Sequence, residues 1–150
     1  YDPIGYLACY ILPGKLIFQE ALRRGLTWDD VIPADLYNRW CDFLDALKSI
    51  CSLKVPRCVK PTLYDDSVIT LHNLSDASLV AYGCMGYIHC RLPSGEVLVN
   101  LLMTKHKVAP LKSCTISRLE LQAATLSAKL NNYLRTELTL NLEPSYFWPD

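Results

Sequence analysis

Three acidic residues stand near the ends of predicted elements, where their side chains could meet. Asp76 follows a stretch rich in β-forming residues and precedes a turn, Glu120 lies in the first turn of a long predicted helix, and Asp150 closes a short apolar run. Carboxylates on three separate elements converge if the helix lies across the sheet, and hard cations such as Mg²⁺ take oxygen ligands. Two such ions, roughly 3.5–4 Å apart, clamp both oxygens of an in-line phosphoryl displacement. The pattern therefore predicts a candidate metal site for phosphoryl-transfer chemistry.

Each of these acids also has a purely structural interpretation. An Asp before Ala-Ser can simply be a turn former, which is the simpler explanation for Asp76 when it is taken alone. Glu120 completes the capping box Ser117-Arg118-Leu119-Glu120, which needs no metal. Asp150 taken alone would be a solvated acid.

The helix face around Glu120 favours a position close to the sheet. The residues three, four and seven positions further along are Ala123, Ala124 and Ser127, all with small side chains. An exposed face would carry long polar side chains at this spacing. We therefore expect the helix to approach a sheet closely, with Glu120 directed toward it and near enough to Asp76 to share a cation.

The composition restricts the class of protein. The 150 residues are 51% hydrophobic and 20% charged, which excludes a disordered or acidic-tail protein. Fifteen basic and fifteen acidic residues give a net charge of zero, so nucleic-acid binding would depend on a local patch and not on bulk charge. No apolar run reaches the roughly 18–20 residues of a membrane helix. The seven cysteines form no C-x-x-C motif.

Residues 1–61 are predicted to form a helical lobe. One helix is expected to start at Pro13 and to stop before Gly25, and a second follows the Thr27–Pro33 segment. Prolines bracket the stretch from residue 56 to residue 61, which cannot hold regular structure for long. The boundary between two lobes is therefore placed at residue 61.

Residues 62–150 are predicted to form a mixed α+β unit in the order strand-strand-strand-helix-strand. The predicted strands are 68–74, 79–92, 97–103 and 145–148, and the predicted helix is 117–138. Short connections should make the first three strands antiparallel in sequence order. The helical crossover should return the fourth strand beside the first, on the side away from the second.

Four basic residues lie close to the predicted long helix and the strand before it. They are Lys105, Lys107, Lys112 and Arg118, and His106 lies in the same cluster. This cluster is either a solvated surface or a phosphate-contacting surface beside the acids, and the sequence favours neither. The three histidines share no metal-ligand spacing and are interpreted as strand and loop residues.

Two motifs carry a resemblance to a known family. The first combines Asp76-Ala77-Ser78 with Ala81-Tyr82-Gly83, and the second is Arg118-Leu119-Glu120-Leu121-Gln122-Ala123-Ala124. In this order they resemble the ribonuclease H region of BEL/Pao-type LTR retrotransposon polyproteins. The segment Tyr1-Asp2-Pro3-Ile4-Gly5 resembles the part of those polyproteins that links reverse transcriptase to ribonuclease H. The resemblance covers nearly the whole chain.

The resemblance implies a piece of a longer polyprotein, with residues 1–61 as a connection segment and residues 62–150 as the first half of a ribonuclease H-like domain. The implied activity is cleavage of RNA in RNA–DNA hybrids with Mg²⁺ or Mn²⁺ during reverse transcription. By position, Asp76 and Glu120 match the first two metal-binding acids, and Asp150 would be the third. The implied partners are the hybrid and the upstream reverse transcriptase domain, without a membrane. The implied location is intracellular, in the cytoplasm or in a virus-like particle.

One departure from the family pattern keeps two hypotheses open. The third acid of the family usually follows Trp-Thr, whereas this chain reads Trp148-Pro149-Asp150, and proline in a central strand removes a ladder hydrogen bond. The first hypothesis is a metal-dependent hydrolase, of which the 150-residue piece alone should bind metal weakly and cleave little. The second is a non-catalytic ribonuclease H-fold scaffold that supports nucleic-acid binding or polyprotein assembly.

Overall fold

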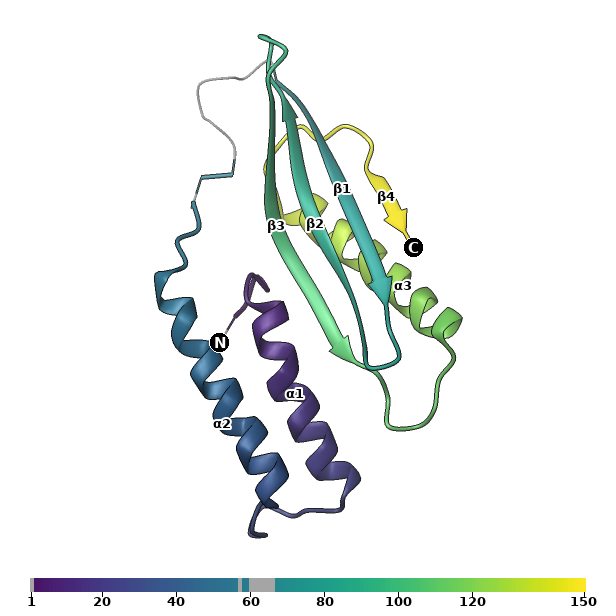
Figure 1. Cartoon of the computed structure of the whole chain (residues 1–150). Helices are drawn as coiled ribbons and strands as arrows, with labels where there is room; N and C mark the ends of the chain where they lie inside the picture. Colours follow the sequence, from purple (N-terminus) through teal and green to yellow (C-terminus); the bar gives the residue numbers. More distant parts are fainter. Residues whose placement is uncertain (1, 57, 60–66) are drawn as a thin grey trace.

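The computed structural model describes residues 2–56, 58–59 and 67–150 (Figure 1). The elements are α1 (Ala8–Arg23), α2 (Ala34–Lys48), the 3-10 helix η1 (Ser49–Ser52), β1 (Val68–Ala77), β2 (Ala81–Arg91), β3 (Val97–Val108), α3 (Ile116–Glu137) and β4 (Tyr146–Pro149). The chain is therefore mixed α+β in the predicted order. The boundary predicted at residue 61 lies outside the described residues. Across the described parts of the chain, no helix has the length and apolar character needed to span a membrane.

Helix α1 begins at Ala8, so the start predicted at Pro13 is wrong. The Asp2 carboxylate accepts hydrogen bonds from the backbone N–H groups of Gly5 and Leu7, at 3.0 and 2.8 Å. These bonds fix the turn that leads into the helix, which therefore starts upstream of the proline. Pro13 therefore lies inside α1. Because proline has no N–H, the helix lacks one internal hydrogen bond at Pro13.

Helices α1 and α2 run in opposite directions and lie side by side (Figure 1). Helix α1 ends before Gly25, as predicted. Arg24, just beyond it, forms an ion pair with Asp35 at the start of α2, with a closest approach of 2.7 Å. In the connecting loop, the Asp30 carboxylate accepts hydrogen bonds from the backbone N–H and the hydroxyl of Thr27. Local polar contacts thus hold the connection between α1 and α2 in the predicted helical lobe.

The four strands form one mixed sheet in the order β3-β2-β1-β4 (Figure 1). Strands β1, β2 and β3 are antiparallel neighbours, and β4 lies parallel to β1 on the side away from β2. The predicted antiparallel order of the first three strands and the predicted position of the fourth strand beside the first are both confirmed. Strands β1 and β3 are longer than predicted, because pairing continues to Ala77↔Tyr82 and Ala81↔Val108. Asp76 therefore lies within β1 and not after it.

Helix α3 packs on one face of the sheet, over β1 and β2. Ala123 and Ser127 are each 1% exposed, which confirms that small side chains bring the helix close to the sheet. The capping box predicted at residues 117–120 is wrong, because Thr115 caps the helix by accepting a hydrogen bond from the Arg118 N–H at 3.4 Å. Glu120 therefore lies two residues beyond the position of a capping-box acid.

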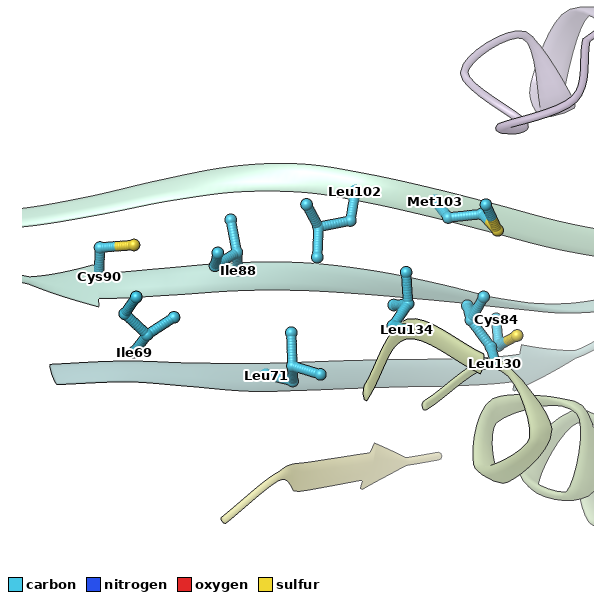
Figure 2. Close-up of a cluster of buried hydrophobic side chains, with 9 residues drawn as sticks. All are labelled: Ile69, Leu71, Cys84, Ile88, Cys90, Leu102, Met103, Leu130 and Leu134. Atoms are coloured by element: carbon cyan, nitrogen blue, oxygen red, sulfur yellow. The ribbon is translucent and has the colours of Figure 1, made fainter. Parts of the chain in front are cut away.

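The core lies between α3 and the sheet (Figure 2). Its buried members are Ile69, Leu71, Cys84, Ile88, Cys90, Leu102, Met103, Leu130 and Leu134. In β1 the core residues alternate with more exposed ones, as expected when successive side chains point to opposite faces. By this alternation Asp76 belongs to the sheet face away from α3.

Candidate functional site

Asp76 and Asp150 come from the neighbouring parallel strands β1 and β4. The Asp150 N–H donates a hydrogen bond to the Ser75 carbonyl at 3.3 Å, one residue beyond the last strand pair, Ser75↔Pro149. Continuing this register by one position sets Asp150 beside Asp76, with the backbones about 4.8 Å apart. The fold therefore brings these two predicted acids to one place at the end of the sheet.

Pro149 leaves this ladder intact. Peptide groups along a strand point alternately to its two sides, so an Asp150 N–H that points toward β1 means that the Pro149 nitrogen points away from it. In the four-strand sheet that side of β4 is the outer edge, where proline removes no ladder bond. The shift of Asp150 that a central-strand proline would cause is therefore not expected, because β4 is an edge strand among the described residues.

An open cleft of about 590 Å³ lies between α1 and the end of the sheet. Asp76 and Asp150 both line it, together with residues of β2 and β3. Helix α1 contributes Ala8, Cys9 and Leu12 to the opposite wall. The N-terminal lobe is therefore part of the same site as the two acids.

The floor of the cleft contains a row of four residues, one each from β1, β2 and β3 and one directly after β4. Asp76 pairs with Gly83, Gly83 pairs with His106, and Asp150 lies beside Asp76. All four residues line the cleft. A Cβ atom at Gly83 would lie 3.0 Å from the Lys105 carbonyl oxygen and 3.3 Å from the His106 Cβ. The glycine therefore allows β3 to approach β2 closely at this point, and it places no side chain between the acids and His106.

A hydrogen bond joins His106 to the N-terminal lobe. The Lys15 Nζ atom on α1 lies 3.0 Å from the His106 Nε2 atom. An ammonium group has no acceptor, so Nε2 accepts and the imidazole is neutral. Burial lowers the pKa of His106, and the charge of Lys15 lowers it further, while Asp2 acts in the opposite direction. The cleft thus carries two carboxylates on one side and, on the other, the His106 imidazole, whose hydrogen-bond partner Lys15 is not one of the lining residues.

Lys15 was not predicted as a site residue, and His106 was predicted only as a member of the basic cluster. A signal for His106 exists in the sequence, because alternation along the two hairpins sets it in line with Asp76 and Gly83. No local signal marks Lys15, since its position depends on how α1 packs against β3.

The other predicted site residues are not among those that line the cleft. Glu120 is half-buried near the start of α3, which begins at the end of the sheet where β1 ends (Figure 1). That it shares a cation with Asp76 stays a prediction. The Lys105 ammonium donates to the Pro3 carbonyl at 3.4 Å. Phosphate contact stays a prediction for the four exposed basic residues Lys105, Lys107, Lys112 and Arg118.

The two cleft carboxylates have the donor chemistry that a hard divalent cation requires. Mg²⁺ is commonly held by one or two carboxylates, with water completing its roughly octahedral set of oxygen ligands. Within the described residues, no group of three His, Cys, Asp or Glu side chains is placed to hold a metal ion. Asp76 and Asp150 therefore fit a largely hydrated Mg²⁺ or Mn²⁺ and not an ion enclosed by protein ligands.

Comparison with known protein families gives a match over the whole length of the chain. The family described as Pao retrotransposon-like RNaseH-like domain matches residues 1–150. No curated protein matches the chain, and no solved structure matches it. The matched range includes α1, so the helical wall of the cleft and the two acids belong to one family unit.

Proposed function

The chain belongs to the family of Pao retrotransposon-like RNaseH-like domains, and we propose from this premise that it serves metal-dependent cleavage of RNA in RNA–DNA hybrids. The proposed metal is Mg²⁺ or Mn²⁺, held by Asp76 and Asp150, and a contribution of Glu120, which does not line the cleft, is tested separately. The proposed partners are the hybrid and the reverse transcriptase domain of the same polyprotein. The proposed location is the cytoplasm or a virus-like particle.

The observation that carries this proposal is the hydrogen bond from the Asp150 N–H to the Ser75 carbonyl. It sets acids from two parallel strands side by side, and both acids line the cleft. Two ionised carboxylates that share one site repel each other. A divalent cation between them removes that repulsion, so the arrangement favours a bound metal.

A bound cation would supply Lewis-acid stabilisation of a phosphodiester oxygen and an activated water. Asp76 and Asp150 would hold and orient it, because strand pairing fixes both backbones. Gly83 adds no side chain to the cleft floor beside the acids. Since two carboxylates supply few of the ligands that two ions need, we expect the 150-residue chain to bind metal weakly and to cleave slowly.

A titration of the 150-residue chain with Mg²⁺, followed by NMR, tests the site. The carboxyl signals of Asp76 and Asp150 should shift together, and Asp76→Asn or Asp150→Asn should each weaken binding severalfold. Glu96→Gln is the matched control, because it removes an exposed acid from the β2–β3 turn at the other end of the sheet. It should leave the affinity unchanged. Glu120→Gln measures the contribution of the third acid.

Cleavage of a labelled RNA–DNA hybrid by the same variants gives a second measurement. Activity that requires Mg²⁺ or Mn²⁺ and is lost in Asp76→Asn would support the hydrolase. The two-acid arrangement also favours one alternative, a non-catalytic ribonuclease H-fold scaffold. A chain that binds the hybrid, shows no metal shift at Asp76 and does not cleave would establish that alternative instead.

A further inference from the structure

We infer that Lys15 and His106 form a binding site for a phosphate of the nucleic-acid backbone, across the cleft floor from Asp76 and Asp150. The choice of a polynucleotide as the ligand rests on the proposed function. The site itself rests on the geometry of the cleft and on the charge of its two sides.

The geometry separates this site from the acids by a fixed distance. His106 on β3 is two strand positions from Asp76 on β1, which corresponds to roughly 9–10 Å between backbones. Gly83 lies between them and has no side chain to fill the gap. An extended phosphodiester chain can therefore lie along the floor, with one phosphate near the acids and another at the Lys15–His106 pair.

Lys15 is an exposed cation whose side chain contacts an imidazole and not a carboxylate. Among the described basic residues, Arg23, Arg24 and Lys48 pair with a carboxylate at 3.0 Å or less, whereas the others form no salt bridge. Within the described part of the chain, Lys15 takes part in no salt bridge and donates instead to a neutral imidazole. A cation that is bonded to a cleft residue and has no carboxylate partner favours an anionic ligand.

Phosphate binding should change the protonation of His106 in a defined direction. The groups that act on this imidazole are Lys15 on α1 and Asp2 on the N-terminal segment, while Gly83 on β2 offers no charge. Burial and Lys15 keep its pKa below the ordinary value of 6.5. A phosphate beside the pair would favour the imidazolium form, so the pKa of His106 should rise when the ligand binds.

Binding of a fluorescent RNA–DNA hybrid in EDTA tests the inference without metal. Lys15→Gln should weaken binding about three- to tenfold and reduce the slope of log K against log salt by about 0.9, the loss of one phosphate contact. Lys15→Arg keeps the charge and should bind nearly as the unchanged chain does. Lys48→Gln is the matched control, because this lysine lies at the exposed end of α2 and pairs with Asp45. It should leave both affinity and slope unchanged.

NMR titration of the His106 ring, with and without the hybrid, gives an independent measurement. The expected result is a higher pKa in the complex, and this rise should be lost in Lys15→Gln. An unchanged salt slope in a folded Lys15→Gln variant, or an unchanged His106 pKa in the complex, would overturn the inference. Loss of hybrid affinity in Lys15→Gln while Asp76→Asn leaves Mg²⁺ binding unchanged would support this site and refute the proposed metal site.

Discussion

The indole nitrogen of Trp148 donates a hydrogen bond to the Nδ1 atom of His72 at 3.2 Å, which joins β4 to β1 through their side chains. The two rings lie nearly parallel, with centroids 6.1 Å apart. Indole N–H is a donor only, so Nδ1 of His72 must be unprotonated. This contact stands two residues before Asp150 on a strand whose four side chains are all exposed. It therefore supplies part of the anchoring that the short strand lacks in buried contacts.

Trp148→Phe should loosen the end of β4. The substitution keeps an aromatic ring but removes the N–H, and a single hydrogen bond is worth about 1 kcal/mol. The Asp150 amide is hydrogen-bonded to the Ser75 carbonyl. A loss of about 1 kcal/mol should make its hydrogen exchange roughly fivefold faster. Trp28→Phe is the control, since that ring is 90% exposed in the N-terminal lobe. Equal exchange of the Asp150 amide in both variants would show that His72 does not anchor the strand.

The stability of the chain should fall between pH 7.5 and pH 5.5. Burial lowers the pKa of His72, with a further contribution from His89, and burial and Lys15 lower that of His106. In the unfolded chain both histidines take up protons as the pH falls through about 6.5, whereas the folded chain resists. The contribution of these two histidines to the free energy of unfolding is therefore fully present above this pH and is lost as the pH falls below it. Urea midpoints at the two pH values measure the effect.

His72→Gln provides the test of that assignment. Glutamine cannot be protonated, and its amide oxygen can still accept a hydrogen bond from the Trp148 indole. The decrease in midpoint between pH 7.5 and pH 5.5 should be smaller in this variant than in the unchanged chain. A midpoint that rises on acidification of the unchanged chain would contradict the sign of the prediction.

The sheet could be predicted from sequence because its determinants are local. Short hairpin connections set the order of β1, β2 and β3, and the small residues along α3 indicate close packing. The start of α1 could not be predicted, because the Asp2 carboxylate that fixes it acts on a turn before the periodic pattern begins. The effect of Pro149 also required the structure, since it depends on whether its nitrogen points toward β1 or toward the outer edge.

The candidate site, too, could be predicted from the sequence only in part. Asp76 and Asp150 could be singled out because acids at strand ends are visible in the sequence. Lys15 could not, because its position beside His106 joins residues 91 positions apart through the packing of two lobes. A charge that acts through tertiary packing leaves no periodic or spacing signal.

Gly5→Ala should destabilise the attachment of α1 to the sheet. Gly5 has a φ of +78°, and a Cβ atom there would clash with the Thr104 backbone oxygen. The adjoining Ile4 carbonyl accepts a hydrogen bond from the Thr104 N–H at 2.8 Å, so the clash falls on a contact that holds the N-terminal segment to β3. We expect the free energy of unfolding to fall by roughly 2–4 kcal/mol, and protection of the Thr104 amide to be lost.

Gly95→Ala is the matched control for that experiment. Gly95 has a φ of +87°, but a Cβ atom there would have no neighbour within 4 Å. Its cost should be the backbone strain alone, about 1 kcal/mol. Urea unfolding of both variants measures the difference, and equal midpoints would show that the contact between Gly5 and Thr104 carries no stability.

Ser127→Ala and Asn131→Ala should have opposite effects, although both residues belong to the buried face of α3. Among the described residues, the Ser127 hydroxyl has no hydrogen-bond partner, so its removal should be neutral or should stabilise the fold by up to about 1 kcal/mol. The Asn131 side-chain oxygen instead accepts a hydrogen bond at 3.1 Å from the amide of Asn73, which is fully buried on β1. Its truncation leaves that amide without this partner and should cost about 1–3 kcal/mol.

Asn132→Ala, at the exposed neighbouring position, controls for the change in helix propensity. Urea midpoints of the three variants should rank Asn131→Ala lowest and Ser127→Ala at or above the unchanged chain. A loss of more than about 1 kcal/mol in Ser127→Ala would mean that a buried water satisfies its hydroxyl, because removing an unsatisfied polar atom cannot cost that much. An Asn131→Ala variant as stable as Asn132→Ala would show that Asn73 does not depend on α3 for its hydrogen bond.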